Sequence, residues 1–278
     1  IFTLARPGDN IVTSLMTYWL EGLQFTLGML AQRYPRAKVV VGGVLPSLAP
    51  VQARSLLPAD HFVQGHGETA VLRLLEDMGA RVSLPHAQSV LDENLLPAVD
   101  LAGTQQFVPL LTSRGCPFHC SYCASRLLNP VFCERRPHDI LAEIAQRRQA
   151  FDSGHFIIFD DALLVNKNER FLPVFSRLAR DRGATLRFHT PNGLHAREID
   201  RESAAVLRAA GFATLRLSFE SLAAGILQRS DGKVKRKQME AAVDNLERAG
   251  YRRGQLGAYL FFGYPGQDMK DMNNALAF

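Results

Sequence analysis

The chain has 278 residues, of which 47% are hydrophobic and 21% are charged, and its formal net charge at pH 7 is +5. This length and composition allow one large or two modest domains with real cores, and they exclude an intrinsically disordered chain. The basic residues are scattered apart from the short run Lys233–Lys237, which reads as the solvated start of a helix, so no nucleic-acid partner is expected.

Residues 1–80 alternate between buried strands and helices. Strands are expected at 10–16, 37–43 and 61–64, and helices at 22–32, 50–56 and 68–78. This alternation predicts a parallel, doubly wound α/β sheet, in which ligands bind at the carboxyl ends of the strands. Ser14, Gly42, Gly43 and the segment 65–68 fall at those ends.

Several sequence features indicate the cellular compartment in which the protein is expected. Residues 11–30 are rich in apolar side chains, but Glu21, Gly22 and Gln24 interrupt them, so no membrane span is expected. No signal peptide is visible, and four cysteines with three in one loop would make a poor disulfide framework, which favours a reducing cytoplasm. The chain opens without an initiating Met and stops inside an expected helix at 275–278, which indicates a fragment of a longer protein.

The second half of the chain repeats the alternation after a predicted linker at 81–106, which contains Pro85 and Pro97. Strands are expected at 107–112, 155–159, 185–189, 214–219 and 255–262, and a helix at 139–151. Polar or glycine-containing groups follow these strands, namely the cysteine loop, Asp160 and Asp161, Asn192 and Gly193, Glu220, and Gly263. A barrel of parallel strands forms its active site at such ends, so residues 107–278 predict a barrel-like α/β domain.

Three cysteines, Cys116, Cys120 and Cys123, lie within eight residues at the spacing C-x3-C-x2-C. Their thiolates can converge on one small inorganic centre, and a cubane iron–sulfur cluster held by only three of them would keep one iron open. Structural zinc is the alternative, with Cys133 as a fourth thiolate. If Cys133 is not a metal ligand, we expect it to be a small buried apolar residue.

The cysteine loop resembles the signature of the radical S-adenosylmethionine (radical SAM) family, C-x3-C-x-aromatic-C, with Tyr122 in the aromatic position and a typical lead-in at 111–117. The resemblance extends from residue 107 to the end and implies a partial (β/α)6 barrel, incomplete at its C-terminus. It also implies a [4Fe-4S] cluster on the three cysteines and S-adenosylmethionine (SAM) on the open iron, cleaved reductively to a 5′-deoxyadenosyl radical. The residues implied to contact SAM are Tyr122, Asp160, Asp161, Asn192, Ser218, Glu220 and Gly263. For Asp160 and Asp161, the alternative role is that of an Asp that caps the following helix, and for Asn192 and Gly193 it is that of a turn.

The segments 13–19, 39–43 and 65–68 together resemble the later part of the Rossmann-like (flavodoxin-like) cobalamin-binding domain that precedes many radical SAM domains. The resemblance implies a groove for the nucleotide tail of cobalamin, lined by Ser14, Leu15, Gly42, Gly43, Gly65, Gly67 and Glu68. The family's Asp-x-His-x-x-Gly loop does not occur in this chain, which leaves the cobalt ligand open. The alternative is a vestigial domain without a nucleotide.

These resemblances imply a cobalamin-dependent radical SAM enzyme, with methyl transfer favoured over rearrangement, acting on a small-molecule or natural-product substrate. An electron donor such as flavodoxin or ferredoxin is implied as a partner. A tRNA methylthiotransferase-like enzyme is the second hypothesis, but it needs cysteines for an extra cluster and none precedes Cys116. A non-catalytic iron–sulfur or zinc module is the third.

Overall fold

A computed structural model of the chain describes residues 11–15, 19–79, 81, 106–151, 153–181, 185–221, 224–229 and 234–278. Contacts between Cα atoms divide the chain into two units. The first comprises Ile1–Leu95 and Leu127–Pro130, and the second Leu96–Arg126 and Val131–Phe278. Apart from residues 81 and 106, the predicted linker lies outside the described residues, as do Lys233 of the basic run and residues 16–18. No helix of the described part has the length and hydrophobicity needed to cross a membrane.

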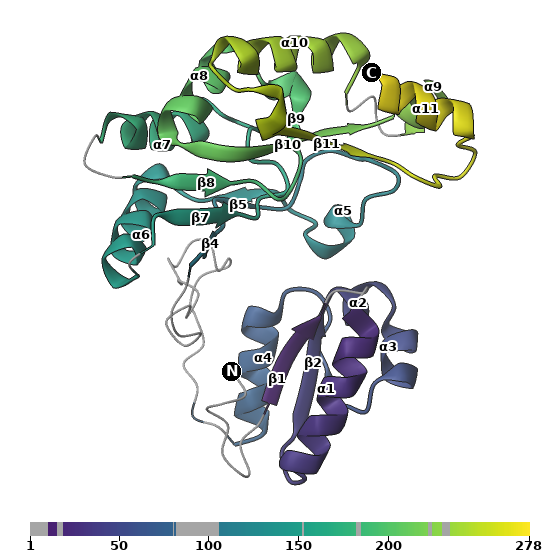
Figure 1. The fold of residues 1–278 in the computed structure, drawn as a ribbon. Coiled ribbons are helices and arrows are strands. Elements are labelled where there is room, and N and C mark those ends of the chain that lie inside the picture. The colour runs from purple at the N-terminus through teal and green to yellow at the C-terminus, as the bar shows by residue number, and fades with distance from the viewer. Residues whose placement is uncertain are drawn as a thin grey trace. The chain divides into compact units, whose positions relative to one another are not determined.

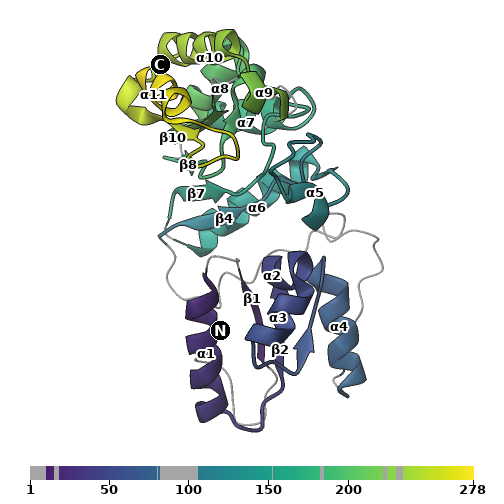
Figure 2. The same cartoon turned by 90° about the vertical axis from the view of Figure 1, so that its right-hand side faces the viewer.

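The first unit contains a parallel three-stranded sheet in the order β1-β2-β3 (Figures 1 and 2). The strands are β1 (Ile11–Leu15), β2 (Val39–Gly43) and β3 (His61–Phe62), and the helices are α1 (Leu20–Arg33), α2 (Val44–Leu48), α3 (Pro50–Leu56) and α4 (Gly67–Asp77). Both views place the sheet between α1 and α4. Consecutive residues Val40 and Val41 are both fully buried, as expected for a strand covered on both faces. The predicted strands and helices are confirmed. Helix α2 was not predicted, and it can contain Pro46 because this residue lies in its first turn, where proline is tolerated.

The carboxyl ends of these three strands meet at one edge of the sheet. The parallel register pairs Ser14 with Gly42 and Leu15 with Gly43. Beyond β3, the Gly65 amide donates a hydrogen bond of 2.9 Å to the Ser47 hydroxyl, which itself donates to the Gly43 carbonyl at 2.6 Å. The later residues of the predicted groove, Gly67 and Glu68, begin α4.

The second unit is built on a parallel sheet in the order β11-β10-β8-β7-β4, with the short β9 also pairing with β10 (Figure 1). The strands are β4 (Val108–Leu110), β7 (His155–Ile158), β8 (Arg187–His189), β9 (Leu194–His195), β10 (Phe212–Glu220) and β11 (Leu256–Leu260). The helices are α6 (Pro137–Ala150), α7 (Phe171–Arg180), α8 (Arg201–Ala210), α9 (Ala224–Arg229), α10 (Arg236–Arg248) and α11 (Met269–Ala277). Apart from β9, each successive strand adds to the same edge, which is the winding of a barrel rather than of a doubly wound sheet. The predicted parallel α/β fold is confirmed here.

One face of this sheet packs against helices and forms the core. Phe188 of β8 and Phe212 of β10 contact Phe175 of α7, Phe212 also contacts Phe171 of α7, and Phe156 of β7 contacts Phe188, with ring centroids 5.0–5.9 Å apart. All five rings are at most 1% exposed. This aromatic layer lies on one face of the sheet, and the intervening residues of the same strands point to the other face.

A short antiparallel hairpin of β5 (Ser113–Arg114) and β6 (Cys133–Glu134) brackets the cysteine loop, which also contains α5 (Ser125–Leu128). Cys133 pairs with Arg114 in this hairpin and is half-buried, so the prediction of a buried core cysteine is wrong. Two-residue strands carry no periodicity, and their pairing depends on contacts between residues 19 and 21 positions apart along the chain, which the sequence pattern could not reveal.

Helix α8, which we did not predict, carries clear end signals. The Asp200 side chain accepts a hydrogen bond from the Ser203 amide at 2.9 Å, and the Ser203 hydroxyl accepts one from the Asp200 amide at 3.0 Å. Gly211 ends the helix in the left-handed region at φ 93°, where a Cβ would also lie 2.3 Å from the Leu186 carbonyl oxygen. A search for Asp and Gly at this spacing would have found the helix.

We expect Asp200→Ala to destabilise the protein by about 1 kcal/mol at pH 7 and to lower its Tm by about 2–4 °C, because α8 loses its N-cap. Burial alone would raise the pKa of Asp200, but hydrogen bonds from Lys167 and Ser203 lower it to about 2. Since the folded-state pKa lies below the unfolded value, this contribution is full above about pH 4 and is lost as the pH falls toward 2. Thermal unfolding of both proteins at pH 7 and pH 3 should therefore show a smaller difference at pH 3. Glu202→Ala, in the same turn, is the control, and a wild-type Tm for Asp200→Ala at pH 7 would contradict the prediction.

Candidate active site

The three cysteines line one cavity of about 290 Å³ at the carboxyl ends of the barrel strands. The loop that carries them leaves β5 through Gly115, whose φ of 83° favours glycine. Within the loop, the Cys123 amide donates to the Cys120 carbonyl at 3.0 Å, and the Ser125 amide donates to the Cys123 sulfur at 3.5 Å. The other lining residues are Phe118, Ser125, Asp161, Pro191, Asn192, Gly193, His195, Ser218 and Tyr259.

The cavity gathers groups that are negatively charged when ionised. Burial raises the pKa of the Cys116 thiol, and Asp161, Cys120 and Cys123 raise it further. No Lys or Arg is among the described lining residues. Three thiolates and a carboxylate in this setting favour a cationic metal centre, which would stabilise the ionised sulfurs.

The geometry of the cysteines bears on the kind of centre they could hold. In the part of the chain that the structure describes, no group of three or more His, Cys, Asp or Glu side chains lies close enough to hold a single metal ion. Three cysteine thiolates that line one cavity are a donor set that fits an iron–sulfur cluster. Cys133, the fourth ligand of the zinc alternative, does not line the cavity.

Asp160 and Asp161 are adjacent in sequence but lie in different environments. Asp161 lines the cavity, and its carboxylate accepts a hydrogen bond of 2.6 Å from the Ser125 hydroxyl. Asp160 is 3% exposed and accepts hydrogen bonds from the Thr112 amide at 2.7 Å and the Ser113 hydroxyl at 2.6 Å. Of the two carboxylates predicted to contact SAM, the structure therefore places only Asp161 in the cavity. The alternative role as a helix cap is wrong, since α7 begins at Phe171 with Arg170 as its N-cap.

Asp160 instead anchors the segment that leads into the cysteine loop. Besides the bonds to Thr112 and Ser113, its carboxylate lies 3.8 Å from the Arg170 guanidinium, which is itself 3.2 Å from Glu134 in β6. Burial raises the pKa of Asp160, while Arg170 and the hydrogen bonds oppose this rise. The network joins the ends of β4 and β7 to the β5–β6 hairpin.

Tyr122 and Glu220 form a pair beside the cavity rather than in its lining. The Tyr122 hydroxyl donates a hydrogen bond to the Glu220 carboxylate, and burial followed by this neighbour raises the pKa of the phenol. Glu220 is 8% exposed and has a φ of 70° at an irregularity of β10 that begins after Ser218. A buried carboxylate in this backbone conformation, hydrogen-bonded to a residue between two cysteines, couples the end of β10 to the cysteine loop.

Asn192 and Gly193 lie between β8 and β9, and Gly193 approaches Ser218 near the end of β10. The Asn192 amide donates to the Phe159 carbonyl at 2.8 Å and so ties the end of β8 to that of β7. A Cβ on Gly193 would lie 2.3 Å from the Ser218 hydroxyl oxygen, so only glycine allows this approach. Gly263, the other glycine predicted to contact SAM, is exposed at φ 76° and does not line the cavity.

Sequence reasoning missed Phe118, His195 and Tyr259 as lining residues. His195 is 4% exposed, its ring lies 4.4 Å from that of Phe118, and the Arg197 guanidinium lies 4.1 Å over the same phenyl ring. The Tyr259 hydroxyl donates to the Pro191 carbonyl. His195 and Tyr259 lie on strands and could have been found only from the register that pairs them with Ser218.

We expect Gly193→Ala to destabilise the protein by about 1–3 kcal/mol, because the new methyl group overlaps Ser218 and the backbone must shift. Gly254→Ala is the matched control, since nothing lies within 4 Å of the position where its Cβ would stand. Denaturant unfolding of both variants measures the difference. Equal stability of the two variants would show that the approach of Gly193 to Ser218 imposes no constraint.

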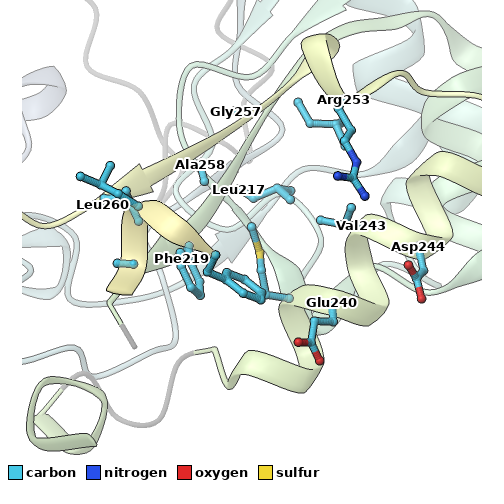
Figure 3. Close-up of a pocket in the computed structure, with 14 residues that line it drawn as sticks. Leu217, Phe219, Glu240, Val243, Asp244, Arg253, Gly257, Ala258 and Leu260 are labelled. Atoms are coloured by element: carbon cyan, nitrogen blue, oxygen red, sulfur yellow. The ribbon is translucent and has the colours of Figure 1, made fainter. Parts of the chain in front are cut away.

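A second cavity, of about 430 Å³, lies between β10, β11, α10 and α11 (Figure 3). Its lining is mainly apolar and includes Leu217, Phe219 and Leu260, with Glu240 and Asp244 on α10. Although larger, it contains no cysteine, histidine or other nucleophile. The cavity with the cysteines is therefore the candidate active site.

The fold and this site define a parallel α/β barrel-like domain whose catalytic edge carries three cysteines. The chain belongs to the radical SAM superfamily, whose sequence profile matches residues 110–278. Membership implies a [4Fe-4S] cluster and SAM as cofactors.

Two solved structures share the fold. The radical SAM methyltransferase TsrM from Kitasatospora setae, with tryptophan and a SAM analogue bound, superposes with a TM-score of 0.70 at 15% identity over 99% of this chain and 60% of TsrM. The cobalamin-dependent SAM radical enzyme OxsB, with aqua-cobalamin and SAM bound, gives a TM-score of 0.68 at 16% identity over 97% of this chain and 43% of OxsB. The chain thus spans about three-fifths of TsrM and less than half of OxsB. No curated protein sequence matches the chain.

Proposed function

We propose that the chain forms the core of a cobalamin-dependent radical SAM enzyme. The observation that carries this proposal is the convergence of Cys116, Cys120 and Cys123 on one cavity with Asp161 and Ser218. A centre held by three thiolates keeps one iron available for SAM. When bound, such a cluster supplies the electron that cleaves a carbon–sulfur bond of SAM.

The lining residues would bind and orient SAM in this cavity. Asp161 offers a carboxylate for the amino group of SAM, the Ser218 hydroxyl offers a hydrogen bond to its carboxylate, and the Asn192 amide oxygen offers an acceptor to its ribose. The Tyr122–Glu220 pair holds the cysteine loop against β10. Phe118 is an apolar wall that helps exclude water, which strengthens the polar contacts inside.

The first unit would bind cobalamin at the edge where its parallel strands end. Ser14 and Leu15 lie beside Gly42 and Gly43 there, and Gly65, Gly67 and Glu68 follow the third strand. In support, TsrM and OxsB, whose structures contain cobalamin, share the fold over nearly the whole chain. TsrM is a methyltransferase, which favours methyl transfer over rearrangement as the reaction. The substrate would be a small molecule or natural product, the electron donor a flavodoxin or ferredoxin, and the compartment the cytoplasm.

Anaerobic reconstitution tests the proposal. The protein should bind about four irons per chain, show a [4Fe-4S] spectrum, and cleave SAM only when reduced. A separate titration with hydroxocobalamin should change the corrinoid absorption spectrum. Iron binding without SAM cleavage would favour a non-catalytic module, zinc alone would refute the cluster, and about eight irons per chain would favour the methylthiotransferase-like hypothesis. An unchanged corrinoid spectrum would remove cobalamin from the proposal and leave the radical SAM part standing.

A further inference from the structure

The face of the second sheet that the helices leave uncovered carries cationic side chains. In β7, β8 and β10, alternate residues are buried against the helices, and the intervening ones point to the opposite face. Those intervening residues include Ile157, which lies beside His189, and five polar ones, His155, Arg187, His189, Thr214 and Arg216. The strand register brings them together, since His155 lies beside Arg187 and Thr214 beside His189. We call these five residues the cationic face.

Hydrogen bonds hold the centre of the cationic face in a defined arrangement. His155 Nδ1 lies 3.0 Å from His189 Nε2, and His189 Nδ1 lies 3.1 Å from the Thr214 hydroxyl oxygen. The two imidazole rings are nearly parallel, at 11°, and the Phe107 ring meets both edge-on. Side chains held in this way lose little freedom when a ligand binds, which favours recognition.

One described carboxylate, Asp181, lines a cavity together with Arg187. Neither Arg187 nor Arg216 forms an ion pair with any residue that the structure describes. Burial, followed by the charges of His155 and Arg187, lowers the pKa of His189, so the positive charge of this face comes from its arginines. An anion is the ligand that such a patch favours.

Gly257 makes room for the Arg216 side chain on this face. A Cβ at position 257 would lie 2.8 Å from Cδ of Arg216, so any other residue would displace the guanidinium. The guanidinium donates one hydrogen bond of 3.1 Å, to the Leu215 carbonyl, which leaves further N–H groups for a ligand.

The cationic face continues into the cavity that the cysteines line. Thr214, Arg216 and Ser218 alternate along β10 and share one face, and Ser218 lines the cavity together with its register partner Tyr259. Arg216 therefore lies about 7 Å along the strand from Ser218. A small molecule held at Arg216 can extend to the centre of the candidate active site.

We propose that the cationic face binds an oxyanion group, a carboxylate or a phosphate, of the substrate whose reacting end lies in the cysteine cavity. This inference rests on the proposed function, because it takes the cysteine cavity to be the place of reaction. Arginine binds both kinds of oxyanion through paired N–H groups, and the imidazole pair adds a donor beside them. The substrate class is thus a small anionic molecule.

The test uses the reconstituted protein with SAM bound, titrated calorimetrically at 0.15 M salt with inorganic pyrophosphate, with succinate, and with uncharged succinamide. We expect one or both anions to bind and succinamide not to bind. Arg216→Gln and Arg187→Gln should each weaken anion binding by about tenfold or more, the loss expected for a charged hydrogen-bonding partner. Arg201→Gln, an exposed arginine at the start of α8, is the matched control and should bind as the wild type does. Arg216→Lys should retain part of the affinity, and thermal unfolding establishes that each variant is folded.

The outcomes separate the two proposals. Binding of pyrophosphate alone assigns the face to a phosphate, and binding of succinate alone assigns it to a carboxylate. No binding of either anion, or an equal loss in Arg201→Gln, overturns the inference, while cleavage of SAM by the same preparation leaves the proposed function intact. Absence of SAM cleavage overturns the proposed function and with it the assignment of the anion to a substrate, whatever the titrations show.

Discussion

Replacing any one of Cys116, Cys120 and Cys123 by serine is expected to abolish the [4Fe-4S] spectrum and to reduce SAM cleavage to background. All three cysteines line the same cavity, and a cubane that loses one of only three protein thiolates has two irons without protein ligands. Iron content, the absorption of the reconstituted protein and release of 5′-deoxyadenosine are the measurements. Circular dichroism of the variants should match the wild type, since none of the three side chains belongs to the hydrophobic core.

Cys133→Ser is the matched control for this series. Cys133 lies in β6 beside Arg114 and does not line the cavity, so this variant should keep its iron and its activity. Loss of the cluster in Cys133→Ser, with the cluster retained in one of the other three variants, would contradict the assigned ligands. That pattern would move the metal site to the hairpin.

We expect substitution of Asp160 to lower the stability of the protein and substitution of the adjacent Asp161 to weaken cofactor binding. Asp160→Ala should destabilise the protein by about 3–5 kcal/mol, because Arg170, which is 2% exposed, loses one of its carboxylate neighbours in the core. The Thr112 and Ser113 hydroxyls lose their acceptor in the same variant. Asp161→Ala should change stability by less than about 1 kcal/mol, because its single hydrogen bond to Ser125 is partly open to solvent.

Urea unfolding and SAM affinity, measured on both variants, distinguish these roles. Asp161→Ala should be folded and bind SAM at least tenfold more weakly, since it removes a charged partner from the cavity. If Asp160→Ala should prove too unstable to purify, Asp160→Asn keeps part of the hydrogen bonding and should show the same order of stabilities. Equal stability of the two alanine variants would refute the anchoring role of Asp160.

The parallel α/β architecture was predictable because each strand is an apolar run followed by a polar or glycine-containing turn. The strands at 155–158 and 256–260 and the helix at 50–56 appear where the pattern places them. Most of the helices around the second sheet were missed, although α8 has a capping Asp and a terminal Gly. The β5–β6 hairpin was beyond reach, since strands of two residues have no period to detect.

The candidate site was predictable in its residue types and less so in its geometry. The spacing of the cysteines identified the loop, and strand-end position identified Asp161, Asn192 and Ser218, all of which line the cavity. Strand-end position could not distinguish Asp160 from Asp161, because their difference depends on which side chain meets Arg170. The cationic face depends on the register that brings together His155 and His189, 34 residues apart, and His189 and Thr214, 25 residues apart, which one sequence does not display.

The opposite environments of Asp160 and Asp161 make the length of β7 more constrained than its composition. Successive side chains of an extended segment point in opposite directions, so one carboxylate reaches the core and the next reaches the cavity. Deleting a single residue from His155–Ile158 would move Asp161 into the position of Asp160 and Ala162 into the position of Asp161, which leaves an apolar side chain beside the cysteines. Conservative apolar substitutions in this strand should therefore be tolerated far better than any insertion or deletion, and variation in strand length among homologues should be concentrated elsewhere in the barrel.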